Sequence, residues 1–517
     1  MNGAESLVRT LLASGIDTCF ANPGTSEMHF VAALDRAPGM RCVLGLFEGV
    51  VTGAADGYAR MTGKPAATLM HCGPGLANGL AYLHNAKRAQ SPIVNIVGDQ
   101  ATYHAPLNPP LASDVEGFAR PVSQWVRKTT HTQTLGTDAA EAVQAAYAPP
   151  GGIATLILPS DVSWNEGGAP GAALPIPTAA KVSDDAVRDA ARALRLGEPT
   201  VILLSGAALH ADALDIAQNI ASATGARIMA PTFNARIARG RGRPLLDIVP
   251  YPVDEAVAQL KDVKHLVLVG TAEPVAFFAY PNKPGIMSPR DAISHVLARS
   301  NEDLKDALTR LAEELDCPDA PIPEIRENAP LPKSAMPRGV MNPEGAGLVL
   351  AALLPDHSIL IDEAITLRAP FFTATRTAAA HDWLQVPGGA IGGGLPLATG
   401  AAVGAPGRRV FAIQADGSAM YTVQALWTQA RENLDVTTIL LSNRKYAILF
   451  HELKQVGAIG GKASTDLFAL DRPEIDWLKL AGSMGVESAR ADTLERFSDL
   501  IQSSNARRGP FLIELVL

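Results

Sequence analysis

The sequence has few cysteines, few aromatic residues and no strong excess of positive charge. Its four cysteines show no C-x-x-C spacing, which disfavours a disulfide framework and predicts reduced thiols. Aromatic residues make up 5% of the 517 residues, and the formal net charge is −8, so no basic surface for nucleic acid or an anionic membrane is expected. These absences predict a cytoplasmic protein without nucleic-acid or membrane partners.

Long hydrophobic runs are also missing. The N-terminal stretch SLVRTLLASG (6–15) has the pattern of an amphipathic helix rather than that of a signal peptide. The longest uncharged run, residues 383–407, contains eight glycines and three prolines. We therefore expect turns and tightly packed backbone there, not a membrane span.

Two stretches rich in proline, glycine or alanine divide the chain. Residues 163–184 form one, and residues 317–343, with seven prolines, form the other. Such composition shifts are typical of domain boundaries. The sequence therefore predicts three domains, at residues 1–162, 185–316 and 340–517.

Each predicted domain alternates short apolar segments with helical patterns. Continuous apolar strands separated by helices indicate mostly parallel sheets with helices on both faces, which is an α/β fold. The segments predicted as strands are AATLM, SPIVNIVGD, PTVILLSG, ARIMAPT, HLVLVG, HSILID, RRVFAIQ, VTTILLSN and PFLIELVL.

The third domain carries the strongest functional signal. Asp416-Gly417-Ser418 follows a predicted strand and begins a helix, and Asn443 ends the next strand. Adjacent parallel strands would bring both segments to the carboxyl edge of the sheet, where α/β folds bind ligands. Carboxylate and amide oxygens suit Mg²⁺, and a helix start beside Gly417 suits a phosphate group. The alternative is an ordinary turn in which Ser418 caps the helix.

Two further segments carry unusual residues. The stretch GGAIGGGLP (388–396) predicts backbone that approaches a ligand closely, but it is not a dinucleotide-binding fingerprint, which disfavours a nicotinamide dehydrogenase. Glu48 interrupts the apolar stretch CVLGLFEGVVTGAADGYAR (42–60). Burying such a carboxylate costs free energy unless it finds a partner.

Together these motifs resemble the thiamine-diphosphate enzymes of the acetolactate synthase, benzoylformate decarboxylase and pyruvate decarboxylase superfamily. The resemblance covers essentially the whole chain and implies a thiamine-diphosphate-binding fold. It makes residues 1–162 the pyrimidine-binding domain, 185–316 the central domain and 340–517 the diphosphate- and Mg²⁺-binding domain. The segments that carry it are NPGTSE, FEGVVTGAADGYAR, HCGPGLANG, GGAIGGGLP, ADGSAMYTVQALWT and SNRKYAI.

The resemblance also implies roles for single residues. Glu48 matches the glutamate that faces the pyrimidine ring and promotes formation of the thiazolium C2 ylid, which attacks a carbonyl. A plain acid in the first turn of a helix is the alternative for Glu48. The implied metal ligands are Asp416, Asn443 and the backbone carbonyl of Lys445. The other implied cofactor contacts are Gly389, Ile391, Gly417, Ser418 and Tyr446. The usual Gly-Asp-Gly begins with Ala415 here.

The substrate pocket is less well specified. His71 matches the histidine that benzoylformate decarboxylase presents to the thiazolium adduct, which implies proton transfer; a hydrogen-bonded structural histidine is the alternative. Thr25 matches that enzyme's active-site serine, although the neighbouring Ser26 could take that role. A second histidine would fall in VAFFAYP (275–281), which has none. His104 either replaces it or is a loop histidine.

The predicted function is a thiamine-diphosphate- and Mg²⁺-dependent decarboxylase or carboligase for a 2-oxo acid, similar to benzoylformate decarboxylase. The family implies a homodimer or homotetramer with active sites between subunits. An acetolactate synthase-like enzyme is the main alternative, although Phe47 replaces a histidine usual there and no FAD segment is matched, so FAD is not expected. A non-catalytic homologue is the second alternative. For His451 and Glu452, substrate selection and simple solvation remain open.

Overall fold

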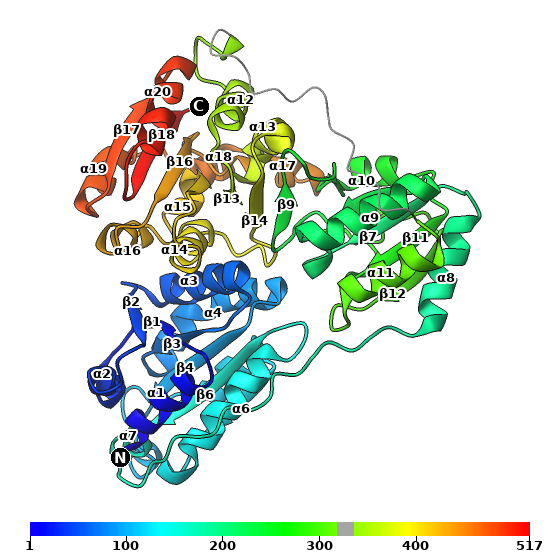
Figure 1. The fold of residues 1–517 in the computed structure, drawn as a ribbon. Helices are drawn as coiled ribbons and strands as arrows, with labels where there is room; N and C mark the ends of the chain where they lie inside the picture. The colour runs from blue at the N-terminus through cyan, green and yellow to red at the C-terminus, as the bar shows by residue number, and fades with distance from the viewer. Residues whose placement is uncertain (318–334) are drawn as a thin grey trace.

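Three sheets organise the chain, and each lies in a separate body of the molecule (Figure 1). The computed structural model describes residues 1–317 and 335–517, so most of the stretch predicted as the second linker lies outside the described residues. The sheets are mostly parallel and carry helices on both faces, which confirms the predicted α/β class. Every segment predicted as a strand contains one.

The first sheet has six parallel strands in the order β2-β1-β3-β4-β6-β5. They are β1 (Thr18–Asn22), β2 (Arg41–Leu44), β3 (Ala66–Met70), β4 (Ile93–Asp99), β5 (Trp125–Lys128) and β6 (Ile153–Pro159). One face packs against α1 (Gly3–Ala13), α2 (Met28–Leu34), α6 (Leu135–Tyr147) and α7 (Ser160–Trp164). The other packs against α3 (Glu48–Thr62), α4 (Cys72–Ala89) and α5 (Val115–Ala119). Since the strands are parallel, the segments that follow them meet at one edge.

The central sheet has five parallel strands in the order β10-β8-β7-β11-β12. They are β7 (Thr200–Leu204), β8 (Arg227–Ala230), β10 (Asp247–Ile248), β11 (His265–Val269) and β12 (Ile293–Ala298). The helices α8 (Asp184–Arg195), α9 (Ala211–Thr224) and α11 (Leu304–Glu314) pack into one core, and α10 (Val253–Leu260) packs into another. This sheet is therefore also covered on both faces.

The third sheet has seven strands in the order β17-β18-β16-β15-β13-β14-β9. They include β13 (Ser358–Glu363), β14 (His381–Gln385), β15 (Val410–Ala415), β16 (Val436–Ser442), β17 (Glu487–Ala491) and β18 (Phe511–Val516). The edge strand β9 (Ile237–Arg239) is antiparallel to β14 and comes from the range predicted for the central domain. The predicted boundaries stay a prediction, and β9 shows that the central segment also contributes to the third sheet.

Helices of the third domain surround this sheet. They are α12 (Pro343–Leu353), α13 (Arg368–Ala374), α14 (Gly394–Gly404), α15 (Asp416–Ala419), α16 (Ala425–Arg431), α17 (Ala447–Gln455), α18 (Lys462–Phe468), α19 (Trp477–Ser483) and α20 (Leu494–Asn505). Among the described residues, no helix combines the length and the apolar character needed to cross a bilayer. The uncharged run 383–407 instead contains the end of β14, a loop and α14.

Helices α3 and α14 join the first and third domains (Figure 1). Their backbones touch because glycines stand at the crossing. A Cβ added to Gly57 would lie 2.1 Å from the carbonyl oxygen of Leu397, and one added to Gly400 would lie 1.7 Å from that of Ala54. No side chain fits in these spaces, so the two helices share one closely packed core.

Candidate active site

The carboxyl edge of the first sheet holds a histidine and a buried carboxylate. Strands β1 and β3 are paired neighbours, so the segments after Asn22 and Met70 meet. His71 donates from Nδ1 to Glu27 Oε2 at 2.9 Å, and the amide of Gly24 donates to the same oxygen at 2.7 Å. The Glu27 side chain is fully buried, whereas that of His71 is 23% exposed. Among the described residues, the second ring nitrogen of His71 has no hydrogen-bond partner, so it could exchange a proton with a ligand.

Ser26, rather than Thr25, contacts this histidine. The hydroxyl of Ser26 donates to Glu27 and lies 3.0 Å from His71 Nδ1. Thr25 is exposed. Ser26 was the alternative that the sequence left open for the hydroxyl role, and the role itself stays a prediction. His104 is also exposed, in the loop after β4, so its assignment stays a prediction as well.

Glu48 begins α3 and is 8% exposed. Its Oε2 accepts a hydrogen bond of 2.9 Å from the amide of Asn78, which lies on α4. A Cβ added to Gly75 would lie 3.2 Å from Glu48 Oε1, so the glycine leaves this side of the carboxylate open. The start of the helix also favours negative charge at this position.

The carboxyl edge of the third sheet brings Asp416 and Asn443 together, as their strands β15 and β16 are paired. Asp416 is 3% exposed, and its carboxylate accepts from the amides of Gly417 at 2.8 Å and Arg444 at 2.6 Å. Burial raises the pKa of this carboxyl above its ordinary value. The Asn443 side-chain oxygen accepts from the amide of Lys445 at 3.1 Å.

Tyr446 and Lys445 lie against this pair. A Cβ added to Gly417 would lie 2.5 Å from the ring of Tyr446, so the glycine is needed for that contact. The carbonyl of Lys445 accepts a hydrogen bond of 3.0 Å from the amide of Ala447, which leaves it one further lone pair. The residues that the resemblance assigned to metal and diphosphate therefore lie at one edge.

The glycine-rich loop between β14 and α14 is held by a carboxylate that the sequence analysis missed. Glu363, the last residue of β13, accepts from the amides of Gly392 at 2.7 Å and Gly394 at 2.8 Å and from the side chain of Gln414 at 2.8 Å. Burial raises the pKa of Glu363 to about 7. Gln414 also donates to Ser418 at 2.6 Å, so one network connects the loop with the start of α15. The sequence feature that could have pointed to Glu363 is its position as an acid at the end of the apolar segment SILIDE.

Gly389 and Ile391 lie within this loop. Gly389 has φ +75°, a conformation that favours glycine, and the ring of Phe277 would be 3.0 Å from a Cβ at that position. The carbonyl of Ile391 accepts from the Tyr82 hydroxyl at 3.2 Å. Phe277 also packs edge-on against Phe233, with ring centroids 5.6 Å apart. The segment VAFFAYP, which lacks the second histidine, therefore borders the loop through the ring of Phe277.

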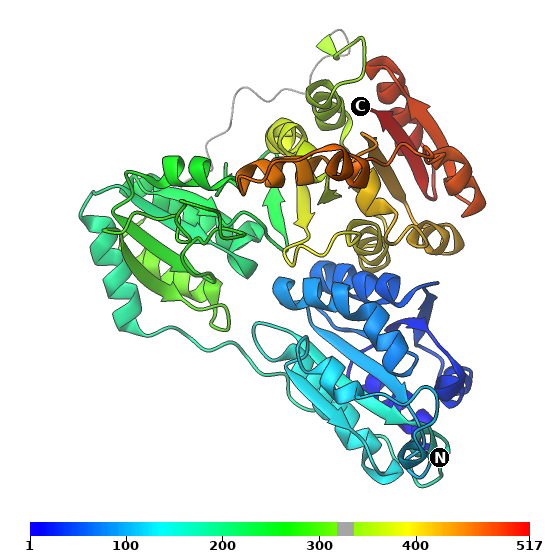
Figure 2. The ribbon, with the colours of Figure 1, turned by 180° about the vertical axis from the view of Figure 1, so that it is seen from behind.

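Glu452 connects α17 to the central domain. Its carboxylate accepts from the hydroxyls of Tyr251 at 3.0 Å and Tyr280 at 2.9 Å. Figure 2 shows α17 and α18 crossing the third domain toward the central one. For Glu452, the hydrogen-bonded contact replaces the simple solvation that the sequence left open. The neighbouring His451 is half-buried.

The donor set at the third edge fits a divalent cation that carries a diphosphate. Asp416 and Asn443 supply hard oxygens, and a carboxylate destabilised by burial gains from a nearby cation. Within residues 1–317 and 335–517, no hydrogen bond or ion pair joins Glu48 to Asp416 or to the loop 386–393. The contacts between the first domain and this loop instead come from α4, where Tyr82 and Asn85 hydrogen-bond the loop backbone.

Comparisons with known proteins agree with this geometry. A family model described as the N-terminal thiamine pyrophosphate-binding domain of thiamine pyrophosphate enzymes matches residues 1–126, and the corresponding C-terminal domain model matches residues 369–515. The chain belongs to the thiamine pyrophosphate enzyme family. It is thus a thiamine diphosphate-dependent enzyme, as the sequence predicted.

Several relatives of this family cover the full chain. A protein of Mycobacterium tuberculosis, provisionally named an acetolactate synthase large subunit, is 48% identical and aligns with 100% of this chain and 99% of its own. The benzoylformate decarboxylase of Pseudomonas aeruginosa is 28% identical, with 97% and 96% covered. A solved 4-hydroxybenzoylformate decarboxylase from Rhodococcus jostii has a TM-score of 0.87 at 24% identity, covering 100% and 99%. The last likeness shows the shared fold alone.

Proposed function

We propose that this enzyme is a decarboxylase or carboligase for a 2-oxo acid, similar to benzoylformate decarboxylase. The observation that carries the proposal is the pairing of His71 with the buried Glu27 at the edge of the first sheet. A histidine whose tautomer is set by a carboxylate can deliver a proton to a carbanion or an alkoxide. The 28% identity to a benzoylformate decarboxylase over nearly the whole chain supports the same choice.

The third domain would hold the cofactor. When bound, thiamine diphosphate supplies the carbon nucleophile that adds to a carbonyl and the electron sink for loss of CO₂. Asp416 and Asn443 would bind Mg²⁺ together with the carbonyl of Lys445. Gly417, Ser418 and Tyr446 would lie against the diphosphate, and Gly389 and Ile391 against the aminopyrimidine ring.

Glu48 would hold the proton that the aminopyrimidine ring needs. Its carboxyl is nearly buried, and within the described part of the chain Asn78 is its only side-chain hydrogen-bond donor, so one oxygen is available to a ligand. His71 would deliver or remove a proton at the substrate carbon and oxygen through its free ring nitrogen. Thr25 or Ser26 would hydrogen-bond the substrate carboxylate, and His104 would supply a second proton-transfer group.

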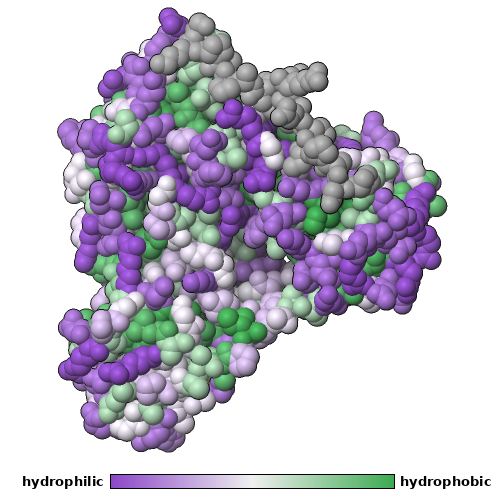
Figure 3. Space-filling model, viewed as in Figure 1, coloured by the Kyte–Doolittle hydropathy of each residue, from purple (hydrophilic) through white to green (hydrophobic). Residues whose placement is uncertain are grey.

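The active unit in this proposal is a cytoplasmic homodimer or homotetramer whose sites lie between subunits. The open oxygen of Glu48, which has room for a partner from outside its own chain, supports it. Hydrophobic residues also gather on the first domain near its junction with the third (Figure 3), and Tyr103 and Leu107 are 69% and 71% exposed. Size-exclusion chromatography with light scattering tests the oligomeric state. The absorbance spectrum of the purified protein tests the expectation that FAD is absent.

The 48% identity to a provisionally named acetolactate synthase subunit favours one second candidate, condensation of two 2-oxo acids. A substrate panel separates the two candidates. The purified protein is incubated with thiamine diphosphate, Mg²⁺ and pyruvate, 2-oxobutanoate or benzoylformate, and CO₂ and organic products are measured. Aldehydes or 2-hydroxyketones support the main proposal, and acetolactate from pyruvate supports the second. Bound cofactor without turnover of any 2-oxo acid would contradict both.

A further inference from the structure

Asn85 on α4 makes two hydrogen bonds to one residue of the glycine-rich loop. Its side-chain nitrogen donates to the carbonyl of Ala390 at 2.8 Å, and the amide of Ala390 donates to its side-chain oxygen at 3.0 Å. Asn85 is 3% exposed. The side-chain amide therefore pairs with Ala390 as a neighbouring strand would, although α4 belongs to the first domain and the loop to the third.

Two glycines of the loop lie so close to Asn85 that a larger residue at either position would collide with its side chain. A Cβ added to Gly388 would lie 2.4 Å from the Asn85 side-chain oxygen, and one added to Gly393 would lie 3.0 Å from its nitrogen. Neither glycine has a left-handed φ, so the backbone alone does not require glycine at these positions. The space that Asn85 occupies is what excludes a side chain there.

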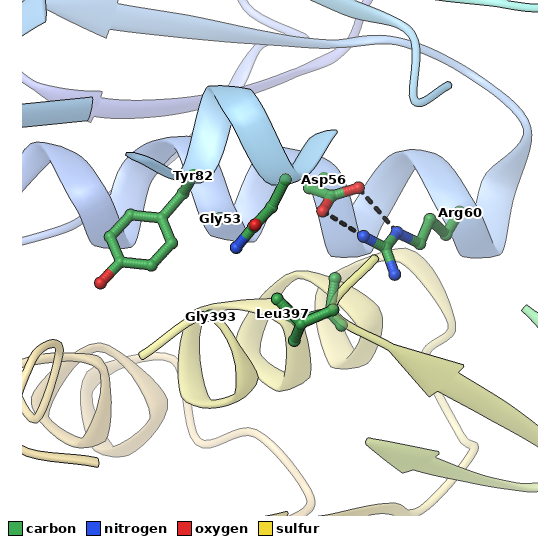
Figure 4. A pocket seen from close by; sticks show the side chains of 8 residues that line it. Gly53, Asp56, Arg60, Tyr82, Gly393 and Leu397 are labelled. Atoms are coloured by element: carbon green, nitrogen blue, oxygen red, sulfur yellow. Dashed lines mark hydrogen bonds and ion pairs between the residues drawn. The ribbon is translucent and has the colours of Figure 1, made fainter. Parts of the chain in front are cut away.

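The cavity beside Asn85 holds little free space. Figure 4 shows it between α3 and α14, where the ion pair of Asp56 and Arg60 and the ring of Tyr82 also line it. Its volume is about 10 Å³, room for about one water molecule. A flipped amide would fill the same space but would set its N–H groups against the amide of Ala390 and its oxygen against the carbonyl, so the observed pairing is the arrangement that satisfies its polar groups.

The loop is held from two domains at once. Glu363 of the third domain binds the amides of Gly392 and Gly394, at the end of the loop. Asn85 binds the centre of the loop, at Ala390, between Gly389 and Ile391. Without Asn85, the backbone of Ala390 would lose both partners, and the centre of the loop would be held less firmly than its end.

We propose that Asn85 is a positioning residue that sets the backbone of Gly389–Ile391 for cofactor binding. This inference rests on the proposed assignment of Gly389 and Ile391 to the aminopyrimidine ring. It adds a residue of the first domain, in the same chain, to the machinery that shapes the cofactor site of the third. Helix α4 thereby connects Asn78, the partner of Glu48, with the loop.

The isosteric change Asn85→Asp tests the proposal. Aspartate keeps the shape but replaces the N–H donor by a second acceptor facing the carbonyl of Ala390. We expect the Kd for thiamine diphosphate, measured at saturating Mg²⁺ by isothermal titration calorimetry, to rise about tenfold at pH 8. A protonated aspartic acid restores a donor, so the ratio of variant to wild-type Kd should fall as the pH is lowered to 6. Asp56 and Arg60 are present in both proteins, and the ratio removes their contribution.

Hydrogen exchange of the cofactor-free protein supplies a second readout. In Asn85→Ala, peptides that cover residues 386–394 should exchange at least about tenfold faster, while peptides from β15 and β16 remain unchanged. The control Asn301→Asp, an exposed site on the central domain, should match the wild type in both measurements. A ratio of Kd values near one at every pH, with unchanged exchange at 386–394, would overturn the inference. Absence of 2-oxo acid turnover in the wild type would instead count against the proposed function and leave these two measurements intact.

Discussion

The carboxylates at the carboxyl edges of the first and third sheets differ in how many hydrogen bonds they accept from the chain itself. At the third edge, Asp416 accepts from two backbone amides and Glu363 from two amides and a side chain. At the first edge, Glu27 is similarly satisfied, but among the described residues Glu48 has one donor, from Asn78. Thr25 and His104 are exposed there. The third edge is therefore organised in advance within one chain, whereas Glu48 retains capacity for a further partner.

This difference separates two tasks. A diphosphate and a cation need fixed oxygens and fixed amides, because their charges must be matched without reorganisation. An acid that holds a proton for a ligand, the role we propose for Glu48, needs one open oxygen, because its partner is the ligand itself. Changes at the third edge should therefore alter cofactor affinity and local stability, and changes at Glu48 should alter turnover.

The largest expected effect comes from Glu48, at the carboxyl edge of the first sheet. Glu48→Gln removes the titratable proton but keeps the size of the side chain and an acceptor for Asn78. We expect kcat to fall about 10³-fold, while thiamine diphosphate still binds and the circular dichroism spectrum is retained. Steady-state kinetics and calorimetry measure the two quantities. The exposed Glu116→Gln on α5 is the matched control, and near-normal turnover in Glu48→Gln would refute the role given to Glu48.

Asp416→Asn probes the carboxyl edge of the third sheet. The new amide would direct an N–H group at a backbone N–H of Gly417 or Arg444, and the proposed metal ligand would lose its charge. We expect the joint affinity for Mg²⁺ and thiamine diphosphate to weaken by about 100-fold or more. Calorimetric titration at several Mg²⁺ concentrations measures this. If the affinity stays within a factor of two, the assignment of the metal to this edge is wrong.

Glu363→Gln tests the hydrogen-bond network of Glu363, Gln414 and the glycine-rich loop without changing a residue that we propose to bind metal or cofactor. Glutamine supplies only one acceptor where backbone amides need two, so we expect the cofactor-free protein to lose about 2 kcal/mol of stability. The pKa of Glu363 is raised to about 7 from 4.5, so between these pH values the folded chain holds a proton that the unfolded chain has released. Its contribution to stability therefore falls as the pH rises through this window, and the variant should lack that slope. Urea unfolding from pH 4.5 to 7 measures both effects, and an unchanged slope would contradict the prediction.

His381 gives the smallest effect at neutral pH, and its pH dependence has the opposite sign. It lies at the first residue of β14, far along the strand from the loop, and burial lowers its pKa from 6.5 to about 3. Between these values the unfolded chain binds a proton that the folded chain does not, so the contribution to stability falls as the pH drops, by up to about 1.4 kcal/mol per unit. His381→Asn keeps a donor for the carbonyl of Ala379 and should flatten the acid side of the stability profile. An acid side as steep as that of the wild type would show that His381 does not titrate in this way.

Much of the fold was predictable because its signals are local. Continuous apolar segments such as VTTILLSN became buried parallel strands, and the helices between them follow from the spacing of apolar residues. The meeting of Asp416 and Asn443 followed from the rule that neighbouring parallel strands end at one edge. The strand β9 was not predictable, because its three residues pair with a strand more than a hundred positions away.

The sequence by itself determined the α/β class and the family, because both depend on the periodicity and motifs of consecutive residues, and it supplied the residues that we propose approach the cofactor. The tertiary structure decided which polar groups support them. In the sequence, nothing distinguishes Glu27, Glu363 and Asn85 from ordinary polar residues. Each has a hydrogen-bond partner far away in the sequence that the tertiary fold brings close. A buried polar group must be paired wherever the fold places it. The identity of that partner is a property of three-dimensional packing and not of the local sequence.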